Sequence, residues 1–584
     1  MRLMVYDLVI RGGSVVDGTG APPRTADVAV QDGLVVEVGK LGVGTTARRT
    51  VDADGAIVTP GFVDIHTHYD GQATWDDHLQ PSAGHGVTTA VTGNCGVGFA
   101  PVRAGDRDTL VELMEGVEDL PGAVLHEGLG WEWESIGEFL DTIERRPHDI
   151  DLATQVCHGP LRVYVMGQRG VDREKATPAD IAEMGRLAAE GIEAGALGFS
   201  TSRTLIHRTS RGEPIPTLRA SRDELVGIGR AIGATGRGVL QVISDFEDFD
   251  AEMATLREVM ESSGRPLSIS VAHSRSGYDY RRCLQVLDEA NAAGLTMRAQ
   301  VAVRAIGMLM GLEGSVNPLK GSATYTAVEH LPLAERARRL AEPSTRATVL
   351  AELSGRTRDP NQPVEQMLSR QPMDRIFVLG DPPDYEPDPS TSIAARAAAA
   401  GRPAEEVLYD LLVGGDGSTL LYVPVANYVD GNLDAVHEML AHPHTLPALG
   451  DGGAHVGIIC DASFPTSLLT HWTRDRTRGP RFDLAWAIRR QCRSTAEAVG
   501  LLDRGLLAPG YKADLNVIDI DGLRLDAPAM VADLPAGGRR YLQSAHGYLC
   551  TAVSGVVTRC DGEATGELPG RLVRGAQQPA GVLT

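Results

Sequence analysis

TPADIAEMGRLAAEGIEAGALGFS, residues 177–200, is the stretch that decides the fold. Thr177 supplies a helix N-cap, Pro178 suits the first helical position, and Asp180 places an acid in the first turn. Apolar residues then recur at helical spacing as far as Gly195, where the helix is expected to end. A short apolar strand over 196–200 follows directly. The stretch therefore predicts one helix that leads into one strand.

The same unit repeats downstream. Ser221-Arg222-Asp223-Glu224 has capping-box spacing and leads through a helix to a strand over 239–243. Helices near 251–262 and 280–293 lead to strands over 267–271 and 295–300. Repeated units with largely apolar strands form a parallel sheet covered by helices. We therefore expect an α/β fold, a (β/α)8 TIM-like barrel over residues 59–499, with its chemistry on the loops that follow the strands.

Both ends of the chain have a different texture. Short strands separated by turns fill residues 1–58 and return over 500–584, so the two ends are expected to pair into one small β-sandwich domain. The barrel rhythm also breaks at about 310–405, a stretch whose later part, 381–389, is too proline-rich for a helix or a central strand. We interpret it as an insertion over the barrel mouth. A lid or recognition loop and a plain surface excursion remain alternatives.

Composition narrows the class of protein. The 584 residues carry 55 Lys and Arg against 77 Asp and Glu, a formal charge of −22, which argues against nucleic acid or an anionic membrane as a partner. No apolar run approaches the roughly 20 residues of a membrane span, and the start of the chain lacks the pattern of a secretory signal. The seven cysteines form no CxxC pair and are expected to be reduced. These features favour a cytoplasmic location and leave a homo-oligomer open.

The sharpest motif is Thr59-Pro60-Gly61-Phe62-Val63-Asp64-Ile65-His66-Thr67-His68. Alternate residues of a strand share one face, so His66 and His68 point the same way and can chelate one ion. The alternative is two histidines on a solvent-exposed strand end. An apolar strand that leads into the pair places it at the functional end of a barrel, which favours the metal site.

Three further strand ends carry candidate ligands. Cys95, in Thr92-Gly93-Asn94-Cys95-Gly96, could be a soft metal ligand, although a lone cysteine is more often an inert buried thiol. His273 ends the strand that begins at Ser268, where a structural histidine is the usual outcome. Asp451 follows a short apolar strand within Gly450-Asp451-Gly452-Gly453, and an isolated Asp-Gly is normally just a turn. Their joint spacing indicates ligands and a carboxylate collected from several barrel strands.

With these motifs the chain resembles the metal-dependent amidohydrolase superfamily, and within it the N-acyl-D-amino-acid deacylase (D-aminoacylase) group. The His-x-His and Asp motifs are shared across that superfamily, whereas Gly-Asn-Cys-Gly is narrower and points to the deacylase group. Nearly the whole chain is covered. The resemblance is carried by residues 61–68, 93–96, 158–162, 195–201, 451–455, 507–515 and 569–571.

The resemblance implies a zinc enzyme with a barrel and a β-sandwich made from both termini. His66 and His68 would bind one metal, Cys95 would bind or bridge metals, and His273 would belong to a second metal. Asp451 would be both a metal neighbour and the general acid/base. Zn²⁺ lowers the pKa of bound water from about 15.7 to roughly 7, which makes a nucleophile available at neutral pH.

One segment departs from the pattern of that group. Deacylases of the group carry a histidine at the end of the fifth strand, but this chain has Gln241 in the strand over 239–243 and no histidine there. None of its four lysines lies at a strand end in the first half of the barrel, where a carboxylated lysine could bridge two metals. We therefore predict one well-occupied Zn²⁺ site, with any second site weak or completed by an unusual ligand such as Gln241.

Substrate recognition is harder to predict. A guanidinium near a strand end could pair with the carboxylate of an amino acid, although any one arginine is more often structural. Histidines in loops could donate to a developing oxyanion, and an aromatic side chain could line an acyl pocket, although core packing is its more common role. The candidates are Arg162, Arg203, Arg275, Arg304, His207, His455 and Tyr278.

Three functions compete. The first is a zinc hydrolase that opens the linear amide of a small-molecule substrate, most like N-acyl-D-amino-acid deacylation. The second is hydrolysis of another C–N bond, in an N-substituted formamide or a cyclic amide, which the missing fifth-strand histidine keeps open. The third is a non-catalytic scaffold of the same fold, against which the candidate ligands argue. Zinc content separates the scaffold from the enzymes, and relative turnover separates the two enzymes.

Overall fold

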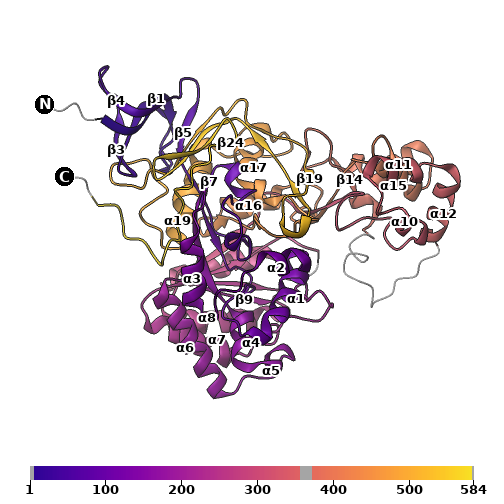
Figure 1. Ribbon diagram of the computed structural model, residues 1–584, viewed down its shortest axis with the longest axis horizontal. Coiled ribbons are helices and arrows are strands. Elements are labelled where there is room, and N and C mark those ends of the chain that lie inside the picture. Colours follow the sequence, from indigo (N-terminus) through magenta and orange to yellow (C-terminus); the bar gives the residue numbers. More distant parts are fainter. Residues whose placement is uncertain (1–4, 276, 355–370, 582–584) are drawn as a thin grey trace.

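A parallel sheet of eight strands forms the centre of the protein (Figure 1). The computed structural model describes residues 5–275, 277–354 and 371–581. Neighbouring strands pair in parallel in the order β16-β12-β11-β10-β9-β8-β7-β6. This is the architecture that the repeated units predicted. The strands are β6 (Phe62–Asp64), β7 (Val87–Thr92), β8 (Asp151–Cys157), β9 (Gly198–Arg203), β10 (Val239–Ser244), β11 (Leu267–Ser270), β12 (Met297–Val301) and β16 (Thr445–Pro447).

The first and last strands of this sheet meet through the segments that follow them. The backbone N–H of Asp451 donates to the carbonyl oxygen of His66 at 3.2 Å, and the N–H of His68 donates to the carbonyl oxygen of Gly452 at 2.8 Å. Thr67 and Gly452 form a parallel bridge between these hydrogen bonds. Both segments lie at the carboxyl ends of their strands. Their pairing therefore brings Asp451 next to His66, although the two are about 385 positions apart in the sequence.

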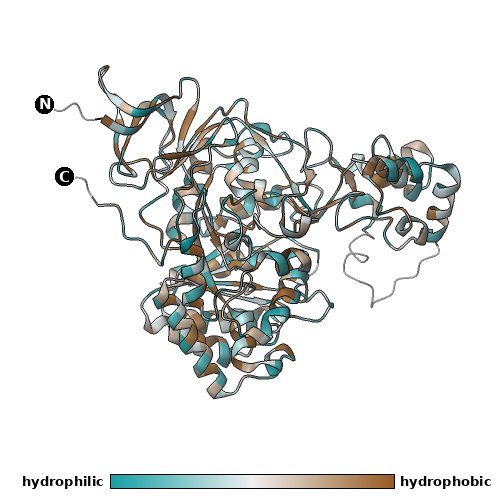
Figure 2. Cartoon of the chain, viewed as in Figure 1, coloured by the Kyte–Doolittle hydropathy of each residue, from teal (hydrophilic) through white to brown (hydrophobic). Residues whose placement is uncertain are grey.

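Amphipathic helices cover the outside of the sheet, and Figure 2 shows that they carry both hydrophilic and hydrophobic residues. Helix α6 (Pro178–Ala194) begins at the predicted N-cap Thr177, which forms a capping box with Asp180, and it ends at Gly195, whose φ of 117° favours glycine. At α7 (Arg222–Ala234), Ser221 accepts from the N–H of Glu224, but the reciprocal bond is not formed. The Glu224 carboxylate pairs instead with Arg162 and His158.

The remaining helices of the barrel region follow the same order along the chain. They are α1 (Arg107–Glu118), α2 (Gly122–Gly128), α3 (Ile136–Arg145), α4 (His158–Met166), α5 (Gln168–Val171), α8 (Phe249–Ser263), α9 (Tyr280–Ala292), α16 (Asp434–Ala441), α17 (Phe464–Thr470), α18 (Leu484–Arg489) and α19 (Thr495–Ala498). No helix among the described residues is long and apolar enough to cross a membrane.

Strands from both chain ends lie in one nine-stranded sheet, ordered β24-β23-β22-β17-β5-β1-β2-β3, with β4 beside β1. Strand β1 is continuous, with a register shift between Ile10 and Gly13. Ser554 and Gly555, which both have positive φ, form the turn between β22 and β23. The strands are β1 (Val5–Val15), β2 (Arg24–Gln31), β3 (Leu34–Gly39), β4 (Thr46–Asp52), β5 (Ile57–Pro60), β17 (Leu515–Ile518), β22 (Tyr548–Val553), β23 (Val556–Cys560) and β24 (Glu563–Ala564).

The segment between β12 and α16 forms a lobe that stands apart from the barrel in Figure 1. Its sheet has the order β13-β15-β14, and its own hydrophobic core includes Met310, Tyr325, Leu340, Ile393 and Leu412. The predicted limits of this insertion, 310 and 405, and the other domain boundaries stay predictions. The elements are β13 (Ile306–Met310), α10 (Ala323–Thr326), α11 (Leu333–Leu340), α12 (Pro343–Ser354), β14 (Phe377–Val378), α14 (Ile393–Ala400), α15 (Ala404–Val413) and β15 (Leu421–Ala426).

Two small hairpins complete the described strands. One pairs β18 (Arg524–Leu525) with β21 (Ala545–His546), and the other pairs β19 (Ala529–Val531) with β20 (Arg540–Leu542). The N–H of Tyr541 in β20 donates to the carbonyl oxygen of Val456 at 2.7 Å. The carboxyl-terminal part of the chain therefore reaches the loop that follows β16.

Candidate metal centre

Three buried donors converge at the carboxyl ends of β6 and β7. One donor atom each from His66, His68 and Cys95 can be chosen so that all three lie within 4.8 Å of one another. The Nε2 atom of His66 lies 3.3 Å from the Cys95 sulfur. Two imidazole nitrogens and a sulfur are a donor set that Zn²⁺ accepts. The structure thus brings together the three residues that the sequence singled out at these two strands.

Asp451 lies beside both imidazoles. Its Oδ1 atom is 3.5 Å from Nε2 of His66 and 3.7 Å from Nε2 of His68, and it makes no hydrogen bond within the described part of the chain. Although burial acts to raise it, the adjacent His68 imidazole holds the pKa of Asp451 well below its usual range. A buried carboxylate that faces two imidazoles in this way fits a cation between them.

The position of Cys95 is fixed by its neighbours in Gly93-Asn94-Cys95-Gly96. Gly93 and Gly96 have positive φ, and a Cβ at either position would collide with the backbone of β8 or β9. The side chain of Asn94 donates to the carbonyl oxygens of Thr67 and Val91. Cys95 itself has a φ of 55°, a strained conformation for a residue with a Cβ. The sequence motif therefore reflects close packing of three strand ends.

The hydrogen bond at Nδ1 of His66 determines that Nε2 is the nitrogen that faces the centre. Nδ1 lies 2.5 Å from Oε1 of Gln300, an acceptor on β12, so Nδ1 carries the proton and Nε2 keeps its lone pair. Burial lowers the pKa of His66 to about 4, which keeps the imidazole neutral and able to bind a cation. Sequence reasoning missed Gln300, because a glutamine in an apolar strand carries no signal of its own.

Burial raises the pKa of the Cys95 thiol to about 12. The thiol is therefore protonated in the absence of a cation, and a bound divalent cation would displace that proton. Gln241, the suggested unusual ligand, uses its Oε1 to accept from the N–H of Cys95 at 3.0 Å, and its Nε2 donates to the Ser270 hydroxyl. Its amide therefore holds the backbone of Cys95.

His273 is not brought to these donors. Its Nδ1 lies 3.9 Å from Asp430, its ring packs against Tyr280, and its backbone pairs with Asn427. Strand β11 ends at Ser270, three residues before His273. That His273 serves a second metal stays a prediction.

Two histidines of the predicted substrate set lie close to the centre. Nε2 of His455 is 3.4 Å from Oε2 of Glu118, a buried carboxylate whose Oε1 is 3.3 Å from Nδ1 of His68. His207 contacts the Ser202 hydroxyl at 2.8 Å, and burial together with the nearby His455 lowers its pKa to about 3. Glu118 was missed by sequence reasoning, because an acid near the end of a helix normally faces solvent.

The other predicted substrate residues are mostly held elsewhere. Arg162 pairs with Glu224, Arg203 with Glu252, and Arg304 with Asp461. Tyr278 packs against Phe246 and Phe249, and its hydroxyl accepts from the N–H of Ala272 at 3.2 Å. The structure therefore gives these four side chains structural partners. Arg275 is exposed in the loop after β11.

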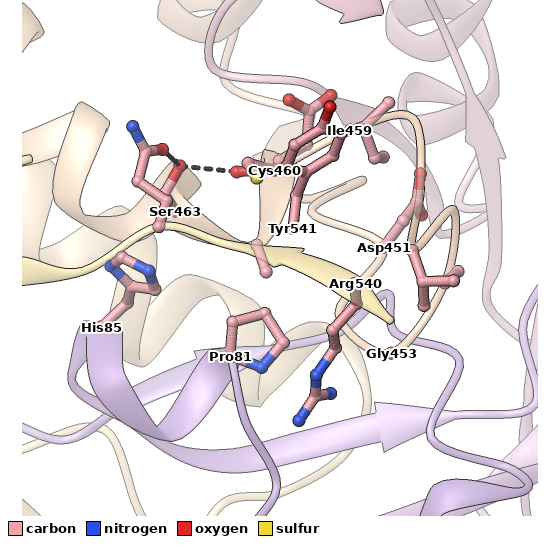
Figure 3. A pocket seen from close by; sticks show the side chains of 14 residues that line it. Pro81, His85, Asp451, Gly453, Ile459, Cys460, Ser463, Arg540 and Tyr541 are labelled. Carbon is pink, nitrogen blue, oxygen red and sulfur yellow. Dashed lines mark hydrogen bonds between the residues drawn. The ribbon is translucent and has the colours of Figure 1, made fainter. Parts of the chain in front are cut away.

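A narrow cavity of about 20 Å³, enough for a water molecule, lies beside Asp451 (Figure 3). Its wall includes His85, Asp461, Ser463, Arg540 and Tyr541, so it runs from the centre toward the β20 hairpin. The Ser463 hydroxyl bridges the Cys460 carbonyl oxygen and Gln543 in this wall. The cavity gives the Asp451 carboxylate a water-sized space.

Comparison with known proteins agrees with this geometry. A model described as the amidohydrolase family matches residues 49–559. The chain belongs to this family. The hydrolase class that the sequence predicted, acting on C–N bonds other than peptide bonds, is therefore confirmed.

Similar proteins cover almost the whole of this amidohydrolase. A D-aminoacylase from Alcaligenes xylosoxydans xylosoxydans is 26% identical over 574 residues, which cover 97% of both chains. A solved D-aminoacylase, described as having a binuclear metal centre with one-metal activation and second-metal attenuation, is 24% identical with a TM-score of 0.64 and covers 97% of this chain and 100% of its own. An N-acyl-D-glutamate deacylase from Bordetella bronchiseptica, complexed with zinc and a phosphonate inhibitor, is 22% identical with a TM-score of 0.62 and covers 98% and 100%. The predicted barrel fold is confirmed.

Proposed function

We propose that this amidohydrolase removes the acyl group from N-acyl-D-amino acids, with one zinc ion in the centre formed by His66, His68 and Cys95. The observation that carries the proposal is the convergence of these donors within 4.8 Å, with the Asp451 carboxylate beside both imidazoles. The similarity to a D-aminoacylase over 97% of the chain supports the substrate class.

The donor set supports zinc on chemical grounds. Asp451 Oδ1 is buried and makes no hydrogen bond within the described residues. Buried polar atoms normally have partners, and a cation beside this oxygen would supply one. His66, His68, Cys95 and Asp451 would hold the ion. When bound, zinc supplies a water of lowered pKa and polarises a carbonyl group.

The residues of this chain would perform the rest of the chemistry. The Asp451 carboxylate accepts a proton from the attacking water and returns it to the departing amine. His207 and His455 would donate hydrogen bonds to the oxyanion that develops on the amide carbonyl. Burial of the centre removes bulk water, which strengthens each of these interactions.

We propose one full zinc site and a second that is weak or empty. The fifth barrel strand offers Gln241 in place of a histidine, and the amide of Gln241 is engaged with Cys95. His273 lies against Asp430 and Tyr280. Metal analysis that found two tight equivalents per chain would contradict this proposal.

Arg275 is the remaining candidate for the substrate carboxylate. It is exposed in the loop after β11, and the structure gives it no carboxylate partner among the described residues. An exposed guanidinium attracts a carboxylate and can bind it through two hydrogen bonds. Replacing Arg275 with alanine should raise KM for an N-acyl amino acid and leave KM for the matching amide without a carboxylate unchanged.

A second function, hydrolysis of an N-substituted formamide or a cyclic amide, keeps support from the missing fifth-strand histidine. The deciding experiment measures amine release from N-acyl-D-, N-acyl-L- and cyclic amides and from formamides, with zinc supplied. Faster turnover of N-acyl-D-amino acids is expected, and turnover confined to cyclic amides or formamides would overturn the proposal. Reduced cysteines are needed for Cys95 to bind zinc, so we propose the cytoplasm as the location.

A further inference from the structure

The carboxylate of Glu118 is buried between two histidines of the centre. Glu118 is the last residue of α1 and is only 1% exposed. Oε1 lies 3.3 Å from Nδ1 of His68, and Oε2 lies 3.4 Å from Nε2 of His455. Neither oxygen makes a hydrogen bond of good geometry to the described residues. A buried carboxylate without such a bond is costly, which indicates that it is kept for a purpose other than packing.

His68 presents its two ring nitrogens to different groups. Nε2 faces Asp451 at 3.7 Å, on the side of the centre, while Nδ1 faces Glu118. Glu118 is not among the donors that gather within 4.8 Å, so its carboxylate lies behind His68. For a metal-binding histidine, the group at the second nitrogen fixes the ring orientation and the tautomer. Gln300 occupies the equivalent place behind His66.

The same residue also holds the loop that carries Asp451. The N–H of His455 donates to the backbone oxygen of Glu118, and the N–H of Gly457 donates to the Asp119 carboxylate at 3.0 Å. The carboxyl end of α1 therefore contacts the loop over 451–457 through two backbone donors and one side chain. One glutamate thus touches both a proposed ligand and the loop of the proposed general base.

We propose that Glu118 is a positioning residue of the zinc centre, which turns Nε2 of His68 toward the ion and anchors His455 beside it. The inference rests on the proposed zinc site and adds a residue that the sequence motifs did not contain. Loss of the carboxylate would free the His68 ring to rotate and to change tautomer, so the ion would be held less tightly.

The test measures zinc affinity in the absence of substrate, by competition with a chromophoric chelator. Glu118→Ala should raise the zinc Kd by about 10- to 100-fold, the usual effect of losing a partner of a metal-binding histidine. Glu118→Gln keeps an acceptor for Nδ1–H and should recover a large part of the affinity. Glu112→Gln is the matched control, since Glu112 lies on the same helix and pairs with the exposed Arg211.

Wild-type zinc affinity in folded Glu118→Ala would overturn the inference, and so would a Glu118→Gln variant that binds zinc as weakly as the alanine variant. Thermal unfolding of the zinc-free proteins shows whether the variants fold, and the isosteric Glu118→Gln keeps the test valid should the alanine variant fail to do so. Wild-type protein that binds zinc but hydrolyses none of the amides would sink the proposed function alone. Wild-type protein that binds no zinc would overturn both.

Discussion

Cys95, Asp451 and His455 all adopt left-handed backbone conformations, with φ of 55°, 47° and 50°. A residue with a Cβ pays about 1–3 kcal/mol for such a conformation when the surroundings enforce it. The surroundings here are hydrogen bonds from other barrel elements, including those of Gln241 and Glu118. The strain is therefore concentrated on residues of the proposed catalytic centre. An informative substitution at these positions must keep the left-handed backbone conformation.

Asp451→Asn should abolish most of the activity while the protein still folds. Asparagine tolerates the left-handed region, so the backbone of the loop is kept, but the amide cannot accept the proton of the attacking water. We expect kcat for an N-acyl-D-amino acid to fall by about 10²- to 10⁴-fold. Steady-state amine release measures the fall, and thermal unfolding checks the fold. A variant that kept a tenth of the wild-type kcat would show that Asp451 is not the proton carrier.

Gln241→Leu should weaken the centre without removing a ligand. Leucine fills a similar volume but cannot accept from the N–H of Cys95, which would then be buried without a partner at a cost of about 1–3 kcal/mol. We expect the variant to unfold at a lower urea concentration and to bind zinc with a higher Kd. Gln241→Glu keeps the acceptor and serves as the control. Equal zinc affinity in Gln241→Leu and wild type would contradict a role in holding Cys95.

Sequence reasoning at this scale works where a motif fixes a backbone position. The His-x-His pair, Cys95 and Asp451 each follow a strand, so their meeting could be predicted from the barrel alone. His273 lies three residues after the end of its strand at Ser270, and a strand end cannot be located to that accuracy from an apolar pattern. Glu118 was missed because the helix that carries it reaches the centre only through tertiary packing.

At the scale of elements, local signals were reliable when no tertiary partner competed for them. Thr177 is the predicted N-cap and forms a capping box with Asp180, and α6 ends at Gly195 as expected. The same spacing at Ser221 gives only half a box, because the Glu224 carboxylate is used between α7 and α4. A capping motif can therefore predict the start of a helix correctly without predicting the partner of its acidic residue, here Glu224.

Glu224→Gln should destabilise the protein in a pH-dependent way. The His158 and Arg162 side chains outweigh burial and lower the pKa of Glu224 to about 2, from about 4.5. A carboxyl group with a depressed pKa stabilises the fold above its unfolded pKa, and this contribution is lost as the pH falls from about 4.5 toward 2. At pH 7 the substitution leaves Arg162 buried with no carboxylate from Glu224 and should cost about 3–5 kcal/mol.

The gap between wild type and Glu224→Gln should therefore narrow in acid, by about 1 kcal/mol between pH 6 and pH 3.5. Urea unfolding of both proteins over this range measures it. Glu183→Gln is a suitable control, since Glu183 pairs with Arg186 on an exposed face of α6 and its loss should have little effect at any pH. A gap that stays constant or widens in acid would refute the assignment of the pKa shift to this buried cluster.

At the scale of the whole molecule, the sequence indicated a barrel and a β unit but not how they are joined. One hydrophobic core lies between β1, β2, β17 and β22, and the barrel core also includes Ile57, Ile518, Tyr548 and Val553 of the β unit. A buried charged cluster adds to this apolar join, and in it Asp151 of β8 meets Arg504 at 2.7 Å and Lys512 at 3.0 Å. Asp151 is 353 positions from Arg504 and 361 positions from Lys512 in the sequence. No local pattern could therefore predict this cluster.

Asp151→Asn should separate the unfolding of the barrel from that of the β unit. The variant keeps an acceptor for the N–H of Arg571 but takes one carboxylate from Arg504 and Lys512, which still pair with Asp503 and Asp514, at a cost of about 1–3 kcal/mol. Because the lost contacts lie between the barrel and the β unit, we expect these two parts of the variant to unfold in separate transitions. Zinc release reports on the barrel, and intrinsic fluorescence on the chain as a whole. Glu132→Gln, which removes an exposed pair with Arg145, should shift neither signal. One coincident transition at an unchanged midpoint in Asp151→Asn would mean that the two parts are held together by apolar packing, and that the buried charges only fix their orientation.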